Sequence, residues 1–161
     1  MKLKDELKYL SDNTKGKMFI KNFRRVNYLS ENKYYRIIGM PFKIYFKILF
    51  NYLLGIDIPQ STKIGYGFNV FHGQGLVISA QTIIGNFVTV RQNTTIGNAI
   101  PGGKCPIIGD NVDIGANCVI IGEITIGDNV KIGAGSVVIK SIPPNCVVVG
   151  NPARIIKMIN L

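Results

Sequence analysis

Aliphatic residues recur every six positions along the middle of the chain, between Ile58 and Val138. An early group is offset by two positions from the rest, and the later positions share one frame with a single interruption. The early group is Ile58, Ile64 and Val70, and the later group is Ile78, Ile84, Val90, Ile96, Ile108, Ile114, Ile120, Ile126, Ile132 and Val138. The residue after the aliphatic is usually glycine. This pattern predicts a parallel β-helix of hexapeptide repeats.

A period of six has a direct physical meaning. One residue in six points inward and is a branched aliphatic, and six residues supply one short strand and one corner of a triangular coil. Each coil leaves its apolar column exposed until the next coil stacks on it. β-Hairpins would instead alternate with a period of two, and an α/β sheet would place helical segments between its strands. The stretch shows neither pattern, so we predict a mainly β protein.

Two irregularities interrupt the repeat. The frame slips by two residues between Val70 and Ile78, in the sequence FHGQGLV, and such a slip in a regular coil is a place where a site can be built. The second irregularity, 98–106, is rich in Gly and Pro, and we predict a loop that replaces one hexapeptide. Pro143 and Pro144 end the repeat, and an apolar strand follows them.

The first 54 residues have a helical pattern instead. We predict a short helix over 1–13, a second helix in the sequence FIKNFRRVNYLS of the basic, aromatic stretch 15–33, a linker at Asn32 and Lys33, and a strongly apolar third helix over 34–54, bent near Pro41. The polar residues of the third helix form one narrow stripe, Arg36, Lys43, Lys47 and Asn51. The expected domains are a basic, apolar helical segment at 1–54, the β-helix at 55–142, and a closing strand and tail at 143–161.

The net charge of +10 is unevenly distributed. Residues 1–54 hold twelve Lys or Arg and four Asp or Glu, whereas residues 55–161 hold seven and five, so +8 of the +10 belongs to the helical segment. The third helix then has two interpretations. It packs against the end of the β-helix or a neighbouring subunit, or it contacts an anionic membrane surface. Nucleic-acid binding is not favoured, because no recognised binding motif accompanies the basic residues.

The cysteines and the apolar segments indicate where in the cell the protein is expected. Three cysteines without paired spacing do not indicate a disulfide framework, and Cys118 and Cys146 are expected to be buried thiols. The start of the chain is charged and lacks a cleavable apolar core, and no apolar run reaches the length of a membrane span. We therefore expect a cytoplasmic protein, peripheral at the inner membrane if the third helix binds lipid.

Four segments carry a resemblance to a known family. They are GIDIPQSTKIGYGFNVFHGQGLVI, TIIGNFVTVRQNTTIGN, CPIIGDNVDIGANCVIIG and IGAGSVVIKSIPPNCVVVGNPARII, and together they extend from Gly55 to Ile156. The chain resembles the left-handed β-helix acyltransferases, in particular the branch with serine acetyltransferases and the acetyltransferases of polysaccharide biosynthesis. The resemblance implies a left-handed coil, acetyl-CoA as the acetyl donor, and a homotrimer with each active site between two subunits.

His72, the single histidine, aligns in this resemblance with the catalytic base of the family. Asp57 precedes it by fifteen residues, the separation of the Asp–His pair in serine acetyltransferases. A neutral imidazole can remove the proton of an alcohol as its oxygen attacks a thioester, and a carboxylate on the other ring nitrogen fixes the tautomer. Direct transfer without an enzyme nucleophile is expected. The alternative is a structural histidine with a turn-capping aspartate.

The resemblance also implies a groove for the pantetheine arm of acetyl-CoA. Small side chains there let a narrow cofactor approach the backbone, although alanine is also simply a good corner residue. The matching positions are Gly97, Asn98, Ala116, Gly133, Ala134 and Gly135. Lys140 and Arg154 are candidates for the CoA phosphates or are ordinary surface charges. No metal is expected, because the β-helix carbonic anhydrases need three histidine ligands and this chain has one.

The chain departs from serine acetyltransferases around the acceptor. Phe71 stands where they carry an acidic residue before the histidine, and Cys105 stands where they carry a second histidine before a proline. The match is closer to the colanic-acid type of polysaccharide acetyltransferase, which has a similar HG motif and a similar RxxxTIGN segment, here beginning at Arg91. We therefore expect Phe71, Arg91, Gln92 and Cys105 to line the acceptor pocket, with the thiol as a wall and not a nucleophile.

Three functions are compatible with these observations. The first is acetyl transfer to a sugar hydroxyl, in a lipid-linked unit of a capsular or extracellular polysaccharide. The second is acetyl transfer to serine or another small molecule. The third is a catalytically inert β-helix scaffold, and the presence of both Asp57 and His72 at the family spacing argues against it.

Overall fold

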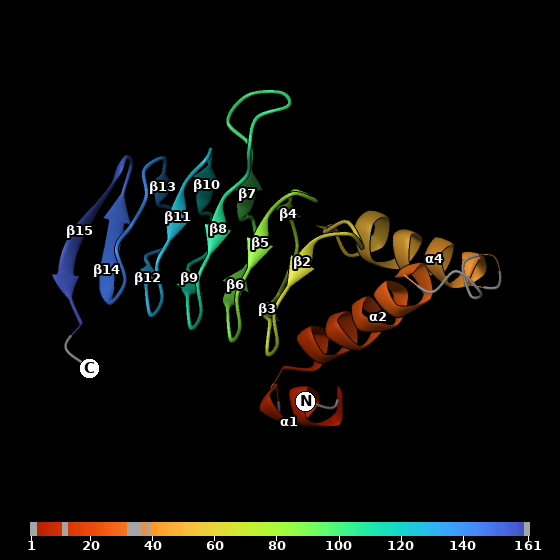
Figure 1. Cartoon of the computed structure of the whole chain (residues 1–161). Helices are drawn as coiled ribbons and strands as arrows, with labels where there is room; N and C mark the ends of the chain where they lie inside the picture. The colour runs from red at the N-terminus through yellow and green to blue at the C-terminus, as the bar shows by residue number, and fades with distance from the viewer. Residues whose placement is uncertain (1–2, 11–12, 32–36, 38, 160–161) are drawn as a thin grey trace.

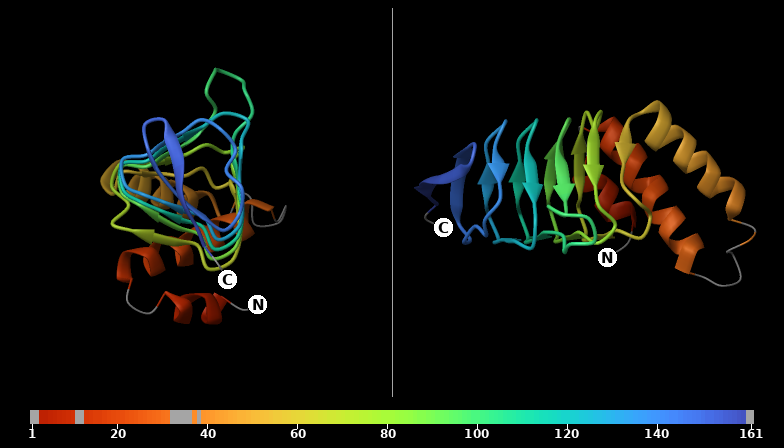
Figure 2. Two further views of the ribbon diagram at one scale, coloured as in Figure 1. Left: turned by 90° about the vertical axis from the view of Figure 1, so that its left-hand side faces the viewer. Right: turned by 90° about the horizontal axis from the view of Figure 1, so that it is seen from above.

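The computed structural model describes residues 3–10, 13–31, 37 and 39–159. A helical module at one end of the molecule is followed by a stack of short strands, and the C-terminus lies at the far end of the stack (Figure 1). Viewed along the stack, the strands outline a triangle (Figure 2). A mainly β coil with a helical N-terminal segment confirms the fold predicted from the six-residue period.

Three sheets form the three faces of the coil. Sheet A has the strand order β1-β4-β7-β10-β13, sheet B has β11-β8-β5-β2, and sheet C has β15-β14-β12-β9-β6-β3. From β1 to β14 consecutive strands therefore fall on different faces, and strands of successive coils pair with one another. The strands are β1 Ile56–Asp57, β2 Lys63–Ile64, β3 Asn69–Phe71, β4 Leu76–Ile78, β5 Ile83–Ile84, β6 Thr89–Arg91, β7 Thr95–Gly97, β8 Ile107–Ile108, β9 Asp113–Ile114, β10 Val119–Ile121, β11 Thr125–Ile126, β12 Lys131–Ile132, β13 Val137–Val138, β14 Cys146–Gly150 and β15 Ala153–Met158.

The aliphatic column of the repeat fills the interior. Every member of the later group is at most 3% exposed. In the early group Ile58 and Val70 are buried and Ile64 is half-buried. Stacking brings equivalent side chains together, as where Ile78 lies opposite Ile96. Burying one such side chain is worth about 1.5–3 kcal/mol, so this column is a major source of stability.

The frame slip before Ile78 is an insertion in one turn. Val77 follows Phe71 by six positions, whereas their sheet partners Thr95 and Arg91 are four positions apart. The turn between β3 and β4 therefore holds two extra residues. The column regains its register after the turn because the extra residues lie outside the paired strands.

The second irregularity is also an insertion. Ile120 follows its partner Ile96 by 24 positions, whereas Val138 follows its partner Ile120 by 18. The extra residues form the loop at 98–106, which projects from the coil between β7 and β8 (Figure 1). The prediction that this loop replaces a hexapeptide was wrong, because β7 and β8 still lie on consecutive faces and no side of the coil is lost.

The helices are α1 Leu3–Tyr9, α2 Thr14–Glu31, α4 Met40–Phe46 and the π-helix η1 Lys47–Leu53. The predicted third helix is interrupted close to Pro41, because Gly39 is a turn residue and Pro41 lies in the first turn of α4, where its missing N–H is tolerated. The geometry changes again at η1, where the Leu54 N–H reaches back five residues to the Leu49 carbonyl (3.0 Å). The start of the predicted third helix lies outside the described residues. None of the helices in the described ranges is long and apolar enough to span a bilayer.

Aromatic rings from the helices close the first coil. Phe19 and Phe23 on α2 pack against Phe46 and Phe50, with centroids 4.7–6.4 Å apart. All four rings are buried and belong to the same core as the aliphatic column. One face of α4 and η1 is therefore core, as the packing interpretation expected.

Polar contacts tie the helices to the coil. The buried Glu6 carboxylate accepts hydrogen bonds from Arg24 Nη2 (2.8 Å) and from the Gly67 N–H (2.9 Å). Asn13 caps α2 by accepting from a backbone N–H in its first turn (2.8 Å), and its amide donates to the Val70 carbonyl (2.7 Å). These bonds fix the helices against β3, the strand that leads into the inserted turn.

The C-terminal strands finish the coil. β14 runs parallel to β12 on sheet C, and β15 turns back antiparallel to β14. β15 thus forms the last edge of sheet C, where its outer residues are largely exposed.

Candidate active site

His72 lies in the two-residue insertion between β3 and β4. Its φ is 65°, and the φ values of Gly73 and Gly75 are 80° and 67°. Histidine is one of the side chains that tolerate this left-handed region, and the glycines adopt it without a steric penalty. The turn leaves His72 exposed at one corner of the coil. The slip in the repeat thus presents the single histidine to solvent.

The next side chain in the turn supports this conformation. The amide of Gln74, oriented by its neighbours, donates to the His72 carbonyl (2.7 Å) and accepts from Lys15 Nζ on α2 (3.1 Å). Gln74 had no role in the sequence-based prediction. The sequence does not indicate this role, because Lys15 is far from Gln74 in the sequence and approaches it only in the folded chain.

Phe71 and Arg91, both predicted to contact the acceptor, contact each other. The Arg91 guanidinium lies over the Phe71 ring, 5.8 Å from its centroid. It also pairs with Asp113 and donates to the Ile114 carbonyl (3.0 Å). Arg91 is thus held within one subunit and fixes the ring directly before His72. A direct role for either residue in acceptor binding stays a prediction.

Asp57 ends β1, and its carboxylate accepts a hydrogen bond from Asn51 Nδ2 on η1 (3.0 Å). Asp57 lies opposite Val77 on β4, and His72 lies in the turn that precedes β4, so both residues lie beside the β1–β4 strand pair. No hydrogen bond joins Asp57 to His72 within the described part of this unbound chain. Catalytic hydrogen bonds often form only in the substrate complex, so the predicted pair stays a prediction.

Asp57 also faces a groove between α4–η1 and the first coil, which we call the helix groove. Its volume is about 690 Å³, within the usual range for small-molecule sites. Its walls include Lys43, Lys47, Asn51, Tyr52, Asp57 and Pro59. The sequence placed three of these on a polar stripe but gave no indication that the stripe faces Asp57.

Part of the predicted cofactor site shares the corner with His72. Gln92, Ala116 and Ala134 hold equivalent places in successive coils, and the Gly135 N–H donates to the Ala116 carbonyl (2.8 Å). A Cβ placed on Gly135 would meet no atom within 4 Å, so this corner is open. The predicted cofactor residues here are Ala116, Gly133, Ala134 and Gly135. Their small side chains fit a narrow chain lying along the corner.

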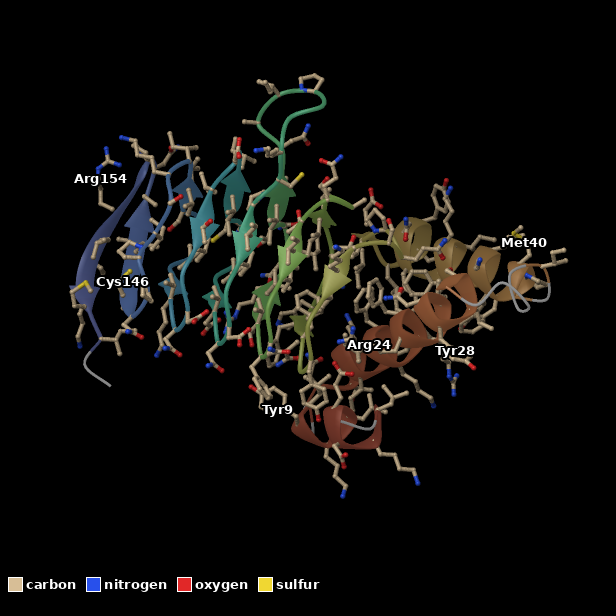
Figure 3. All side chains as sticks on the ribbon, viewed as in Figure 1. Tyr9, Arg24, Tyr28, Met40, Cys146 and Arg154 are labelled. Carbon is tan, nitrogen blue, oxygen red and sulfur yellow. The ribbon has the colours of Figure 1, made fainter. Side chains whose placement is uncertain are left out.

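The other predicted cofactor residues lie elsewhere in the subunit. Gly97 ends β7, Asn98 follows it, and Lys140 follows β13, so these residues lie at the C-terminal ends of the sheet A strands, away from the His72 corner. Arg154 lies on β15 at the far end of the molecule (Figure 3), where it donates to the Ala153 carbonyl (3.0 Å). A single subunit therefore does not gather all the predicted contacts around one cofactor.

The cysteines are buried. Cys105 lies at the base of the protruding loop, with its Sγ 3.2 Å from Ser79 Oγ. Cys118 and Cys146 are buried as predicted, and burial raises the pKa of both thiols, which disfavours the reactive thiolate.

The sequence and the fold both match known acyltransferases. The family model described as bacterial transferase hexapeptide (six repeats) matches residues 105–140. WcaB of Escherichia coli (strain K12) is 40% identical to this chain over 116 residues. It is provisionally named as an acetyltransferase of colanic acid biosynthesis. That match covers 71% of this chain and 72% of the relative. A serine acetyltransferase of Synechococcus elongatus is 39% identical over 106 residues, covering 65% of this chain and 43% of that enzyme.

Solved structures of serine acetyltransferases share the fold. The enzyme from Brucella abortus strain S19 superimposes with a TM-score of 0.82 and 27% identity, covering 98% of this chain and 68% of that chain. The soybean apoenzyme superimposes with a TM-score of 0.79 and 31% identity, covering 94% of this chain and 66% of that chain. These matches confirm the left-handed parallel β-helix. Taken with the hexapeptide repeat, they show that the chain belongs to the bacterial hexapeptide-repeat transferase family and is an acetyltransferase.

Proposed function

We propose that this enzyme transfers an acetyl group from acetyl-CoA to a sugar hydroxyl during the synthesis of a capsular or extracellular polysaccharide. The observation that carries the proposal is the 40% identity to the E. coli relative named for colanic acid biosynthesis, over 72% of its length. Phe71 and Cys105, which replace polar residues expected in serine acetyltransferases, support a different acceptor. The reaction takes place in the cytoplasm, where acetyl-CoA is made.

His72 acts as the general base in this proposal. It takes the proton of the acceptor hydroxyl as the oxygen forms a bond to the acetyl carbon, and it returns that proton to the departing thiolate as the carbon–sulfur bond breaks. Asp57 orients the imidazole and stabilises its charged form. Backbone N–H groups stabilise the oxyanion. The exposed, left-handed turn supports this role, because it places the imidazole where two substrates can approach.

Acetyl-CoA, when bound, supplies the acetyl thioester. Ala116, Gly133, Ala134 and Gly135 would hold its pantetheine arm along the His72 corner. We further propose a homotrimer in which Gly97, Asn98, Lys140 and Arg154 approach the same arm from a neighbouring subunit. The separation of the two groups within one chain supports this arrangement, because each group alone forms only one wall.

Serine is the acceptor in the second candidate function. The specific observation in its favour is the likeness to serine acetyltransferases, with TM-scores of 0.82 and 0.79.

The deciding experiment follows the release of free thiol from acetyl-CoA with a panel of sugars, sugar nucleotides and serine. Turnover that depends on a sugar, with an acetylated product found by mass spectrometry, supports the first function. Turnover with serine alone replaces it with the second. Absence of turnover with every hydroxyl acceptor, in a protein that binds acetyl-CoA, contradicts both.

A further inference from the structure

α4 and η1 have two apolar faces, and only one is covered. Phe46 and Phe50 are buried against α2 and the first coil. Met40, Ile44, Ile48 and Tyr52 recur every four residues and are 51%, 54%, 50% and 73% exposed. We call these four residues the apolar row. A contiguous row of exposed apolar side chains usually marks an interaction surface, so the row implies a partner that this structure does not contain.

The π-helix keeps the row straight. Side chains four apart drift around an α-helix, because four residues exceed one turn of 3.6. The wider turn of η1 offsets this drift over its own length, so that Tyr52 continues the line of Ile44 and Ile48. By the same geometry Asn51 continues the line of Lys43 and Lys47 along the helix groove. The result is an apolar row beside a polar line with two positive charges, and Met40, Ile44 and Tyr52 of the row also line the helix groove.

The polar line carries the positive charges of two lysines. In the part of the chain that the structure describes, neither Lys43 nor Lys47 takes part in an ion pair. Asp57 is a carboxylate in the same groove, and it accepts a hydrogen bond from Asn51. The surface therefore combines exposed aliphatic and tyrosine side chains with uncompensated positive charge.

We propose that this surface of α4–η1 docks on an anionic lipid bilayer. Apolar side chains with tyrosine at the boundary, flanked by lysines, are the features of helices that lie in a membrane interface. Lys43 and Lys47 meet the lipid phosphates while the apolar row enters the headgroup layer. The helices project beyond the end of the coil (Figure 2), and Met40 points away from it at the outer end of α4 (Figure 3), so a flat surface can reach the row.

Charge disfavours a twofold contact between two copies of this surface. A twofold contact would place the same patch on both partners, and thus the same lysines on each side. Residues 1–54 carry +8, so that contact would be repulsive, whereas an anionic leaflet attracts the same charge. The docking also brings the helix groove, with Asp57 in its wall, close to the membrane surface. The docking itself does not depend on the identity of the acceptor.

The test is co-sedimentation of the full chain with vesicles of phosphatidylcholine alone or mixed with phosphatidylglycerol. We expect binding to the mixed vesicles that weakens as salt rises. Lys43→Gln/Lys47→Gln should bind roughly thirtyfold more weakly, the effect of removing two basic residues near an anionic surface. Ile44→Ser/Ile48→Ser should lose roughly tenfold or more through the lost apolar contact. All four side chains lie outside the core, so folding should be retained, as checked by thermal melting.

Matched controls come from the opposite end of the molecule. Lys131→Gln/Lys157→Gln removes the same charge, and Ile155→Ser/Ile156→Ser removes the same kind of exposed aliphatic pair. Both should bind vesicles like the wild type. Equal binding to the two vesicle types, or equal losses in the test and control variants, overturns the proposal. A fall in oligomeric mass for Ile44→Ser/Ile48→Ser without a change in vesicle binding assigns the row to subunit contact instead. Acetyl transfer to a soluble acceptor is measured separately, so loss of docking is distinguishable from loss of catalysis.

Discussion

At the scale of single residues, His72 is defined by the backbone that carries it. Its left-handed conformation is stabilised by the flanking glycines and by the hydrogen bond from Gln74 to its carbonyl. The imidazole itself has no structural partner in the described chain, so its removal should leave the coil intact. That separation of chemistry from folding makes the residue testable.

We expect His72→Ala to lower acetyl transfer by at least about a hundredfold, because general base catalysis typically contributes 10² to 10⁴. The melting temperature and molecular mass should stay those of the wild type. Asn111→Ala, which changes another exposed left-handed corner residue, is the matched control and should keep its activity. Wild-type turnover by the histidine variant would refute the assignment.

Asp57→Asn tests the orienting carboxylate. The variant keeps the size of the side chain but loses the charge that favours the imidazolium and the correct tautomer. We expect a fall in turnover that is no larger than that of His72→Ala. The rate of thiol release under saturating substrates measures this turnover. If Asp57→Asn is less active than His72→Ala, Asp57 has a role beyond orienting the imidazole.

Glu6 is a buried carboxylate that connects α1 to α2 and to the first coil. It is 3% exposed and accepts from both Arg24 and the Gly67 N–H. Glu6→Gln would leave Arg24 partly buried without its counter-charge, and we expect a loss of about 2–3 kcal/mol in the free energy of unfolding. Urea denaturation measures the loss. Glu123→Gln breaks the exposed pair with Lys104 and should change stability by only about 0–1 kcal/mol; equal effects would contradict the distinction.

Thiol reactivity follows from burial in the same way. Cys118 and Cys146 are buried, and burial raises the pKa of each thiol, so little thiolate is present at neutral pH. We expect alkylation by iodoacetamide to be slow in the native protein and fast in urea, as followed by peptide mass spectrometry. Rapid native labelling of either cysteine would show that its part of the coil opens readily.

At the scale of elements, the repeat tolerates additions only where strands are absent. The two inserted segments occupy corners, at His72 and at 98–106, because a corner can lengthen without breaking the pairing of the next coil. The longer loop carries no part of the aliphatic column. Its exposed Ile100 and its mixed Gly and Pro content indicate a role outside folding.

Removing residues 98–103 tests that role, because it restores the regular spacing of six between Ile96 and Ile108. We expect the coil to remain folded with a similar melting temperature, since short surface loops add little to stability. Turnover should fall roughly tenfold or more if the loop positions a substrate. A deletion variant with full activity would show that the loop takes no part in the reaction. A deletion variant that does not fold would show that the coil needs the loop for its stability.

At the scale of the whole molecule, the coil presents flat faces with exposed aliphatic side chains. Ile83 and Ile107 stand side by side on sheet B and are 40% and 46% exposed, and Val77 on sheet A is 41% exposed. Closed threefold symmetry would cover such faces without leaving free edges. The predicted cofactor residues lie partly at the His72 corner and partly at the C-terminal ends of the sheet A strands, and this separation also leads us to expect a trimer.

We therefore expect a homotrimer, with a mass of three times the 17.7 kDa chain by light scattering after gel filtration. Ile83→Glu/Ile107→Glu should reduce the mass, because trimer formation would bury unpaired carboxylates in each interface. The exposed Thr125→Glu, on the same sheet but without aliphatic surface, gives the comparison. A monomer at micromolar concentration would contradict the proposed site between subunits.

The sequence by itself determined the coil, because a period of six is a local property that each repeat carries in full. It also located His72, since a break in a regular frame is visible without any contact. The tertiary structure decided what depends on segments distant along the chain or on backbone geometry. It placed Asn51 against Asp57, paired the strand of Asp57 with the strand that follows His72, and made the loop an addition and not a replacement. It also divided α4–η1 into a covered and an uncovered apolar face, because composition shows how apolar a helix is but only packing shows which side is buried.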